Sequence, residues 1–191
     1  MRELVYYVAV SLDGFIADPE GGFDAFIADG DHSSAILGDY ADALPVHALT
    51  ALGIEPPGTR FDTVVMGWNT MIPALDAGIA SPYPHLRQVV ATRQARELDP
   101  EIEPTADPLT SVQLLKGQPG LDIWLCGGGQ LAGTLLPEID RLVLKRHPIV
   151  FGSGIALFGN HHASTTQFTP NGHRKFQSGV VIEEYSRRAL P

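Results

Sequence analysis

The sequence predicts an α/β protein with a mostly parallel central sheet, helices on both faces and an antiparallel strand pair at its C-terminal end. Two observations predict this class. In the first part of the chain, short apolar runs typical of buried strands alternate with helix-like segments, an order that favours a parallel sheet. In the last part, two β-like runs follow each other with no helical pattern between them, so we expect them to pair antiparallel.

Composition limits the size and the partners of the protein. The 191 residues are 44% hydrophobic and 18% charged, which suits one globular domain over residues 1–191. The net charge of −9 argues against nucleic acid and anionic membranes as partners, because both need basic surfaces. No apolar run is long enough to span a bilayer. The single cysteine, Cys126, excludes an internal disulfide and fits a reducing cytoplasm.

The N-terminal elements follow from local patterns. Leu4–Val10 is apolar on both faces, as expected of a strand covered on both sides. Residues 11–22 are rich in Asp, Gly and Pro and therefore form a loop. Its apolar island at 15–17 is expected to pack back on the body or to close over a ligand. Residues 31–34 offer N-cap side chains, which predicts a helix over 35–43 that Pro45 kinks or ends.

The remaining elements are expected in chain order. They are a turn at 53–58, a buried strand at Phe61–Gly67, a helix from Trp68, a strand at 86–92, a solvated acidic connection at 97–108, a helix at 109–116, a strand at 123–126, a helix at 130–136, and β-like runs at 139–151 and 176–185 around a polar stretch at 159–174.

Three consecutive glycines, Gly127, Gly128 and Gly129, separate a strand from a helix. Bare backbone N–H groups beside a helix N-terminus suit a phosphate. The alternative is a tight crossover in which glycine only relieves crowding. The spacing also fits G-x-G-x-x-G/A, but a Rossmann fingerprint follows the first strand and has an acid about 20 positions on. Here the glycines follow the fourth expected strand and the region around Phe151 has no acid, so a Rossmann site is excluded.

Other strand ends strengthen the case for a phosphate ligand. In open α/β sheets, ligands bind at the carboxyl ends of parallel strands. Helices starting at Trp68 and Gln130 could share an extended diphosphate, and Arg93 could hold another phosphate with its fork of donors. Taken alone, Arg93 is better interpreted as an ordinary solvated arginine.

Several other kinds of site are excluded. The sequence has neither a P-loop nor a G-x-S-x-G nucleophile elbow. The seven histidines lack metal-ligand spacing, even at the adjacent His161 and His162, so surface histidines and no metal are expected. Cys126 has no base near it in sequence and is interpreted as a small buried residue.

Four segments in order resemble the dihydrofolate reductase-like superfamily. They are SLDGFIAD at 11–18, VMGWNT at 65–70, GGGQL at 127–131 and PIVFGSGIALF at 148–158. The most similar branch is the reductase domain of the bifunctional riboflavin-biosynthesis deaminase-reductases and its stand-alone relatives, and the resemblance runs from residue 5 to about 185. It implies the three-layer fold of that superfamily. It also implies a nicotinamide-dependent reductase, usually NADPH-dependent, that acts on a pteridine- or pyrimidine-like heterocycle.

The resemblance also implies roles for individual residues. The family usually has a basic residue after the Met-Gly pair, where this sequence has Trp68, which implies a weaker phosphate grip or an altered pocket. Residues 23–58, where the substrate side is normally built, are hard to align. Carried over by position, the cofactor-binding residues are Ala9, Ile16 and Ala17 at the nicotinamide, Gly67, Trp68, Asn69 and Thr70 at the phosphates, Thr92 and Arg93 at the adenosine 2′-phosphate, and Gly127, Gly128, Gly129, Gln130 and Leu131 at the diphosphate.

The expected chemistry is hydride transfer from NADPH to an electron-poor C=N or C=O carbon. Asp13, just after the first strand, is the candidate catalytic residue, which would contact the substrate or position a proton. Its alternative role is a turn-forming Asp-Gly pair. Asp39, Asp42 or water could instead donate the proton.

Two other functions stay open for this sequence. One is a non-catalytic protein that binds a nucleotide or heterocycle. The other is an enzyme of another type that uses the glycine loop for a different phosphate ligand. The resemblance implies a homodimer through the terminal strands, and the runs at 139–151 and 176–185 supply the apolar material that such an interface would need.

Overall fold

The structure is a computed structural model that describes residues 1–159 and 165–188. Its helices are α1 (Ser33–Tyr40), α2 (Val46–Leu52), α3 (Trp68–Asp76), α4 (Pro108–Lys116) and α5 (Gly129–Leu135). Its strands are β1 (Leu4–Val10), β2 (Phe15–Ala17), β3 (Phe61–Gly67), β4 (Arg87–Ala91), β5 (Ile102–Thr105), β6 (Asp122–Gly127), β7 (Arg141–Arg146), β8 (Ile155–Ala156), β9 (Phe168–Lys175) and β10 (Val181–Arg187).

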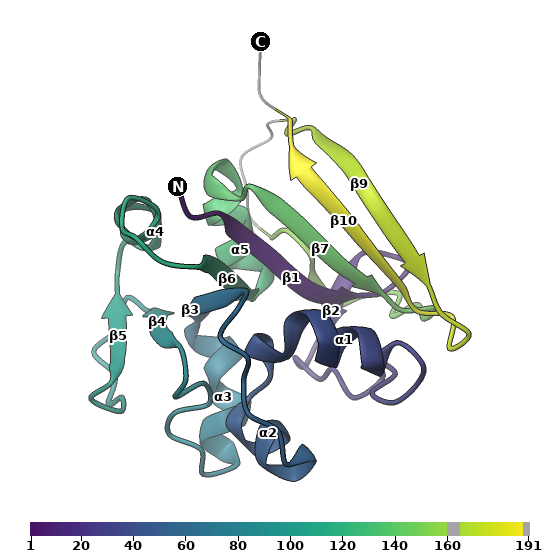
Figure 1. The fold of residues 1–191 in the computed structure, drawn as a ribbon. Coiled ribbons are helices and arrows are strands. Elements are labelled where there is room, and N and C mark those ends of the chain that lie inside the picture. Colours follow the sequence, from purple (N-terminus) through teal and green to yellow (C-terminus); the bar gives the residue numbers. More distant parts are fainter. Residues whose placement is uncertain (160–164, 189–191) are drawn as a thin grey trace.

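The main sheet has eight strands in the order β5-β4-β3-β6-β1-β7-β10-β9 (Figure 1). All pairs from β5 to β7 are parallel, and β10 runs antiparallel to both β7 and β9. Strands β2 and β8 pair separately as a small antiparallel sheet. The expected class, mostly parallel with an antiparallel C-terminal pair, is confirmed.

Helices cover both faces of the sheet, as predicted. On one face, α4 and α5 contribute Val112, Leu115 and Leu135 to a core that includes Leu4 and Tyr6 of β1. On the other face, α1 and α3 contribute Tyr40 and Met71 to a core built on neighbouring positions of the same strands. Because β1 alternates between the two cores, it is apolar on both sides. None of the helices within the described ranges is long and apolar enough to cross a membrane.

Two expected loop regions, and one segment for which no element was predicted, contain regular structure. The acidic connection at 97–108 holds β5, a short edge strand that has one buried residue and tolerates Pro104 because its outer side is unpaired. The polar stretch at 159–174 overlaps β9, the other edge strand, whose residues are nearly all exposed. Pro45 does not only end a helix, since it is the N-cap of α2, which the sequence did not predict.

Two expected boundaries were also wrong. The β-like run at 139–151 forms a strand only over β7, and Pro148 just beyond it has no N–H to continue a ladder. The N-cap expected from residues 31–34 is absent, because Asp31 instead accepts hydrogen bonds from the backbone of Gln177 and Ser178. Its carboxylate therefore holds the β9–β10 turn against the start of α1.

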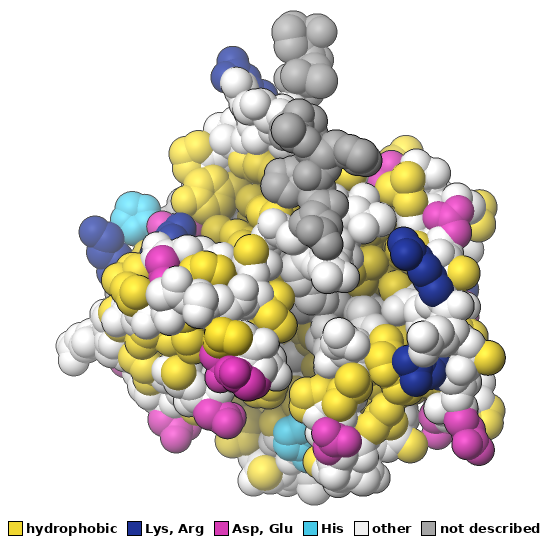
Figure 2. All heavy atoms as spheres, turned by 180° about the vertical axis from the view of Figure 1, so that it is seen from behind, with side chains coloured by type: hydrophobic (Ala, Val, Ile, Leu, Met, Phe, Trp, Pro, Cys, Tyr) yellow, Lys and Arg dark blue, Asp and Glu magenta, His cyan; other side chains and the backbone are white. Residues whose placement is uncertain are grey.

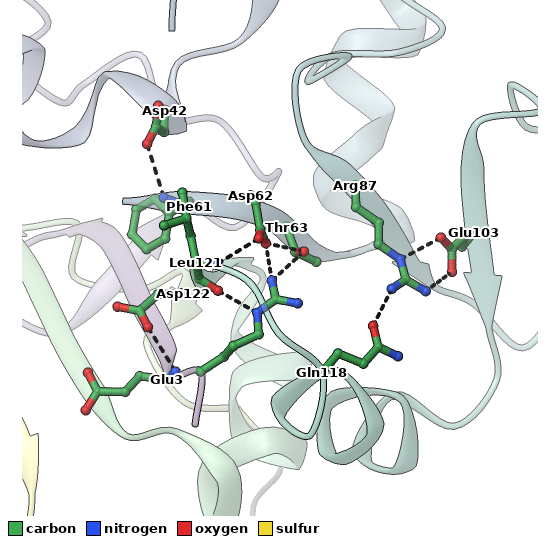
Figure 3. Close-up of polar contacts among 11 residues, drawn as sticks. Glu3, Asp42, Phe61, Asp62, Thr63, Arg87, Glu103, Gln118, Leu121 and Asp122 are labelled. Carbon is green, nitrogen blue, oxygen red and sulfur yellow. Dashed lines mark hydrogen bonds and ion pairs between the residues drawn. The ribbon is translucent and has the colours of Figure 1, made fainter. Parts of the chain in front are cut away.

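The amino ends of the parallel strands are fastened together by polar side chains (Figure 3). Arg2 contacts Asp62 and donates to Thr63 Oγ1 at 2.7 Å, while Asp62 accepts from the Leu121 amide at 2.7 Å. Nearby, Asp42 accepts four backbone N–H groups from residues 58–61. The opposite edge, where the parallel strands end, is the edge predicted to bind a ligand.

Candidate nucleotide-binding site

Three turns that the sequence singled out lie side by side at the carboxyl edge of the sheet. Strands β4, β3 and β6 are parallel neighbours, so Ala91, Gly67 and Gly127 end at the same edge. A Cβ placed on Gly67 would lie 3.7 Å from the Gly127 carbonyl oxygen. A Cβ on Gly128 would lie 3.6 Å from Thr70 Oγ1. The turn before α3 and the turn before α5 therefore form one continuous backbone surface.

The glycine triplet has a different environment at each position. Gly127 has φ +134°, a conformation that strongly favours glycine, and its peptide bond to Gly128 is cis. At Gly129 a Cβ would lie 2.0 Å from the Ala156 carbonyl oxygen. Glycine therefore relieves crowding at Gly129. At Gly128 it does not, because a Cβ there would make only an ordinary contact with Thr70. The turn follows β6, the sixth strand in sequence order and not the fourth, because β2 and β5 were not counted.

The loop after β1 forms one wall of the site. Ile16 and Ala17 lie on β2, which pairs with β8, and the Leu157 amide donates to the Gly14 carbonyl at 2.9 Å. The Gly159 amide donates to the Gly129 carbonyl at 2.8 Å, which ties this small sheet to the start of α5. The apolar island therefore packs back on the body. Figure 2 shows the molecule from behind, with its surface hollowed between two lobes.

Two arginines lie in the loop that follows β4. Arg93 is exposed and makes no hydrogen bond or ion pair within the described residues. Thr92 Oγ1 donates to the Gln94 carbonyl at 3.1 Å, and this hydrogen bond shapes the turn that carries Arg93. Arg96 places its guanidinium 4.5 Å from the centre of the Trp68 ring. A positive charge therefore lies at the position where Trp68 replaces the usual basic residue, and local sequence gave no signal of it.

The remaining predicted cofactor residues surround these turns. Ala9 is half-buried near the end of β1, opposite Lys145 in the register of β7. Asn69 and Gln130 are exposed at the starts of α3 and α5, whereas Leu131 is buried in the core. Their contacts with a cofactor stay a prediction.

The three acids considered as proton donors all have protein partners. Asp13 accepts from Ser11 Oγ at 2.6 Å and from the Gly152 amide at 2.7 Å, and these hydrogen bonds lower its pKa. Asp39 forms an ion pair with Arg174 at 2.6 Å. Burial would raise the pKa of Asp42, but its backbone N–H donors outweigh that effect and lower it. Each acid thus has a structural role, and the catalytic role of Asp13 stays a prediction.

A second group of polar side chains, which the sequence did not identify, lies on the α1–α3 face near the ends of β1, β6 and β7. Lys145 places Nζ 4.3 Å from the centre of the Tyr7 ring, and burial lowers its pKa to about 8. Burial raises the pKa of Cys126 to about 11, so it is a thiol at neutral pH, and Tyr83 hydrogen-bonds to it. The interpretation of Cys126 as a non-nucleophile fits this environment.

Other surface features do not compete with this site. An open hollow of about 420 Å³ lies at the amino edge of the sheet, beside Asp39 and Arg60 and away from the strand ends. Among residues 1–159 and 165–188, no three His, Cys, Asp or Glu side chains are arranged to hold a metal ion. His161 and His162 lie outside the described residues.

A mostly parallel sheet with an antiparallel end and adjoining glycine-bearing turns at its carboxyl edge is the arrangement expected of the dihydrofolate reductase-like class. The chain belongs to the RibD C-terminal domain family, whose model matches residues 2–182. The expected fold and the resemblance to riboflavin-biosynthesis reductase domains are therefore confirmed.

Individual relatives agree with this membership. The uncharacterized protein YwjB of Bacillus subtilis (strain 168) is 29% identical over 190 residues, 95% of this chain and 96% of the relative. A candidate riboflavin biosynthesis protein of Shewanella sp. PV-4 has the same fold at TM-score 0.68 and 22% identity, over 99% of this chain and 100% of that one.

A bifunctional relative shares the fold over part of its length. It is the diaminohydroxyphosphoribosylaminopyrimidine deaminase/5-amino-6-(5-phosphoribosylamino)uracil reductase of Thermotoga maritima. It matches at TM-score 0.67 and 15% identity, over 98% of this chain and 57% of that one. This chain thus has the family membership and the fold of a reductase domain.

Proposed function

We propose that the protein is an NADPH-dependent reductase that transfers a hydride to a pteridine- or pyrimidine-like heterocycle. The observation that carries the proposal is the pair of adjoining turns at the carboxyl edge, where Gly128 faces Thr70 at the start of α3. Two arginines without carboxylate partners in the described chain, Arg93 and Arg96, lie in the loop after the neighbouring strand.

The residues of this edge fit a dinucleotide. A side chain at Gly128 would fill the space in front of Thr70, so glycine keeps that space open for a diphosphate. Backbone N–H groups of 67–70 and 127–131 would hold the diphosphate, and Thr92 and Arg93 the 2′-phosphate. Ala9, Ile16 and Ala17 would contact the nicotinamide. When bound, the cofactor supplies the hydride, and the chain supplies alignment and exclusion of water.

Arg96 extends this proposal beyond the family pattern. Stacked on Trp68, its guanidinium is held near the start of α3 without using a carboxylate. It would supply the charge that a basic residue at position 68 usually gives. The loss of a basic residue at position 68 implies weaker phosphate binding, and Arg96 would compensate for it from the loop after β4.

The test is binding of NADPH and NADH to the wild type and to single variants, followed by tryptophan fluorescence and thermal shift. We expect Arg93→Ala and Arg96→Ala each to weaken NADPH binding about tenfold, equivalent to about 1.4 kcal/mol. Arg93→Ala should affect NADH less, because NADH lacks the 2′-phosphate, whereas Arg96→Ala should weaken NADH to a similar degree. Arg188→Ala, at the far end of β10 where the arginine contacts Gln167, is the matched control and should change neither. A wild type that gives no shift at millimolar NADPH would rule the cofactor out.

One alternative is a non-catalytic protein that binds a nucleotide or heterocycle. The structural partners of Asp13, Asp39 and Asp42 favour it, because none of the three acids is left free. Such a protein would bind NADPH or a heterocycle yet oxidise no NADPH across a panel of pterins, pyrimidines and flavin precursors. Mass spectrometry of a co-purified ligand would separate both functions from an enzyme that uses the glycine turn for another phosphate. A cytoplasmic location is proposed with either function.

A further inference from the structure

Lys145 is set apart from the other basic residues of its strand. On β7, Arg141 reaches Glu184 at 3.2 Å and Arg146 reaches Glu183 at 2.8 Å, both across the pair with β10. Lys145 lies between them in sequence, but the residues that face it in the neighbouring strands are Ile182 on β10 and Ala9 on β1. Neither neighbour carries a charge, so the register itself leaves this ammonium without a carboxylate.

The surroundings of Lys145 do not compensate its charge either. The side chain is half-buried and makes no hydrogen bond or ion pair within the part of the chain that the structure describes. Its contacts are the face of the Tyr7 ring at 4.3 Å and the electrostatic influence of the Cys126 thiol. His147, just beyond β7, is neutral at pH 7 because burial, Lys145 and His32 lower its pKa to about 4. A desolvated charge without a partner is costly, and such groups concentrate at functional sites.

A second polar group beside Lys145 also lacks a partner. The hydroxyl of Tyr7 is buried and has no hydrogen-bond partner, whereas the neighbouring Tyr40 hydroxyl donates to Glu184 at 2.9 Å. Buried hydroxyl groups are normally satisfied, so an unpaired one next to an unpaired ammonium needs an explanation. Both side chains project from the α1–α3 face, and Lys145 lies one residue from the carboxyl end of β7, at the edge that carries the glycine turns.

We propose that the Lys145 ammonium is the substrate-side anchor and selects heterocycles whose ring oxygen is negatively charged. The proposal rests on the proposed function, because it places the ring next to Ala9, where the nicotinamide is expected. The occupant is a pyrimidine- or pteridine-like ring with an ionised carbonyl oxygen, which would take the position that carboxylates take beside Arg141 and Arg146. The anchor would give a preference for anionic rings that none of the three acids could give, since Asp13, Asp39 and Asp42 are negatively charged.

The test compares two ring probes of similar shape, barbiturate, which is ionised at neutral pH, and uracil, which is not. Binding is measured by calorimetry with NADP⁺ present, for the wild type, Lys145→Met, Lys145→Arg and the exposed control Lys175→Met. We expect the wild type and Lys175→Met to prefer barbiturate. Lys145→Met should lose at least tenfold in barbiturate affinity with little change for uracil, and Lys145→Arg should keep part of the preference.

A pH series on the wild type gives a readout that needs no variant. Because burial lowers the pKa of Lys145 to about 8, barbiturate affinity should fall as the pH rises through 8, while Lys145→Arg should lack this fall. The groups near the ammonium are Tyr7, Cys126 and His147. The first two have pKa values above this range and His147 below it.

Each outcome of the series decides the inference. Equal barbiturate affinity in the wild type and Lys145→Met overturns it, and so does a wild type that binds NADPH but not barbiturate. Barbiturate binding that depends on Lys145 without any NADPH binding supports the anchor and instead rejects the reductase. If Lys145→Met loses barbiturate affinity and binds NADPH as the wild type does, the result supports both the Lys145 anchor and the proposed reductase function.

Discussion

His147 is a buried imidazole whose protonation the fold opposes. Its ring contacts Phe26 and His32, at 4.9 and 5.9 Å between ring centres, and its Nδ1 accepts from the Ile27 amide at 3.2 Å. Burial, then Lys145, then His32 lower its pKa to about 4. A protonated His147 would lose the hydrogen bond from Ile27 and place two positive charges close together.

The pH dependence of folding should therefore carry a signature of His147. Its pKa is about 4 when folded and near 6.5 when unfolded, so its contribution is complete above pH 6.5 and is lost as the pH falls toward 4. We expect the free energy of unfolding in urea to drop by about 3 kcal/mol over this interval from this residue. His147→Asn should flatten that part of the curve, whereas the exposed His47→Asn should leave it unchanged. Parallel curves for the wild type and His147→Asn would contradict the assignment.

Site residues that lie at strand ends could be predicted from the sequence. Those whose contacts depend on the register between strands, or on a loop that folds back, could not. The turns at Gly67 and Gly128 were predicted to meet because parallel neighbours end at the same edge. Arg96 reaches Trp68 only because the loop after β4 folds back. Lys145 faces Tyr7 only because β7 pairs with β1 in one particular register. No local pattern encodes either contact.

At the scale of elements, the start of α5 depends on the small β2–β8 sheet. Gly129 has no room for a side chain, since a Cβ there would lie 2.0 Å from the backbone of Ala156. Because the obstacle is backbone, it cannot rotate away. The same contact holds the wall of the site against the turn that is expected to hold a diphosphate.

Gly129→Ala is expected to disrupt this packing. The variant should lose about 3 kcal/mol in the free energy of unfolding, because the small sheet must move away from α5. NADPH binding should weaken with it. Gly38→Ala, on the exposed side of α1 with no atom within 4 Å, is the matched control and should gain roughly 0.5–1 kcal/mol from helix propensity. Chemical denaturation of both variants measures the difference, and equal stabilities would show that the β8 segment moves freely.

Elements with a continuous apolar face were predictable, and edge elements were not. β1 and β3 have the predicted bounds, because both faces of each strand are buried and the apolar run defines the strand. β5 and β9 lie at the two ends of the sheet, where solvent on the outer side permits prolines and charged residues. Their sequences read as loops for that reason. α2 is short and has one fully buried residue, so its periodicity is weak.

At the scale of the whole molecule, the predicted homodimer has to use surface other than the apolar faces of β7 and β10. Leu142, Val143, Leu144 and Ile182 are already buried in the core. The terminal strand that offers an unpaired edge in the described chain is β9. We propose that a second copy pairs or packs there, since exposed edges readily take another strand.

Light scattering after size exclusion tests the assembly. We expect a mass twice that of the 20.6 kDa chain. A variant with Asn171→Lys and Gly172→Lys, two exposed positions on β9, should shift the mass to that of the monomer through charge repulsion, with NADPH binding retained. A monomeric wild type would contradict the proposed dimer.

The position of β1 in the sheet has a consequence for how the protein is made. β1 is synthesised before its two neighbours in the sheet, β6 and β7, which lie much later in the chain. Until β6 has been synthesised, this apolar strand has no permanent partner on either side, and until β7 follows it has a partner on one side only. Leu4–Val10 therefore stays exposed to transient contacts or to a chaperone until those two strands have been made, and the carboxyl edge of the sheet can assemble only afterwards.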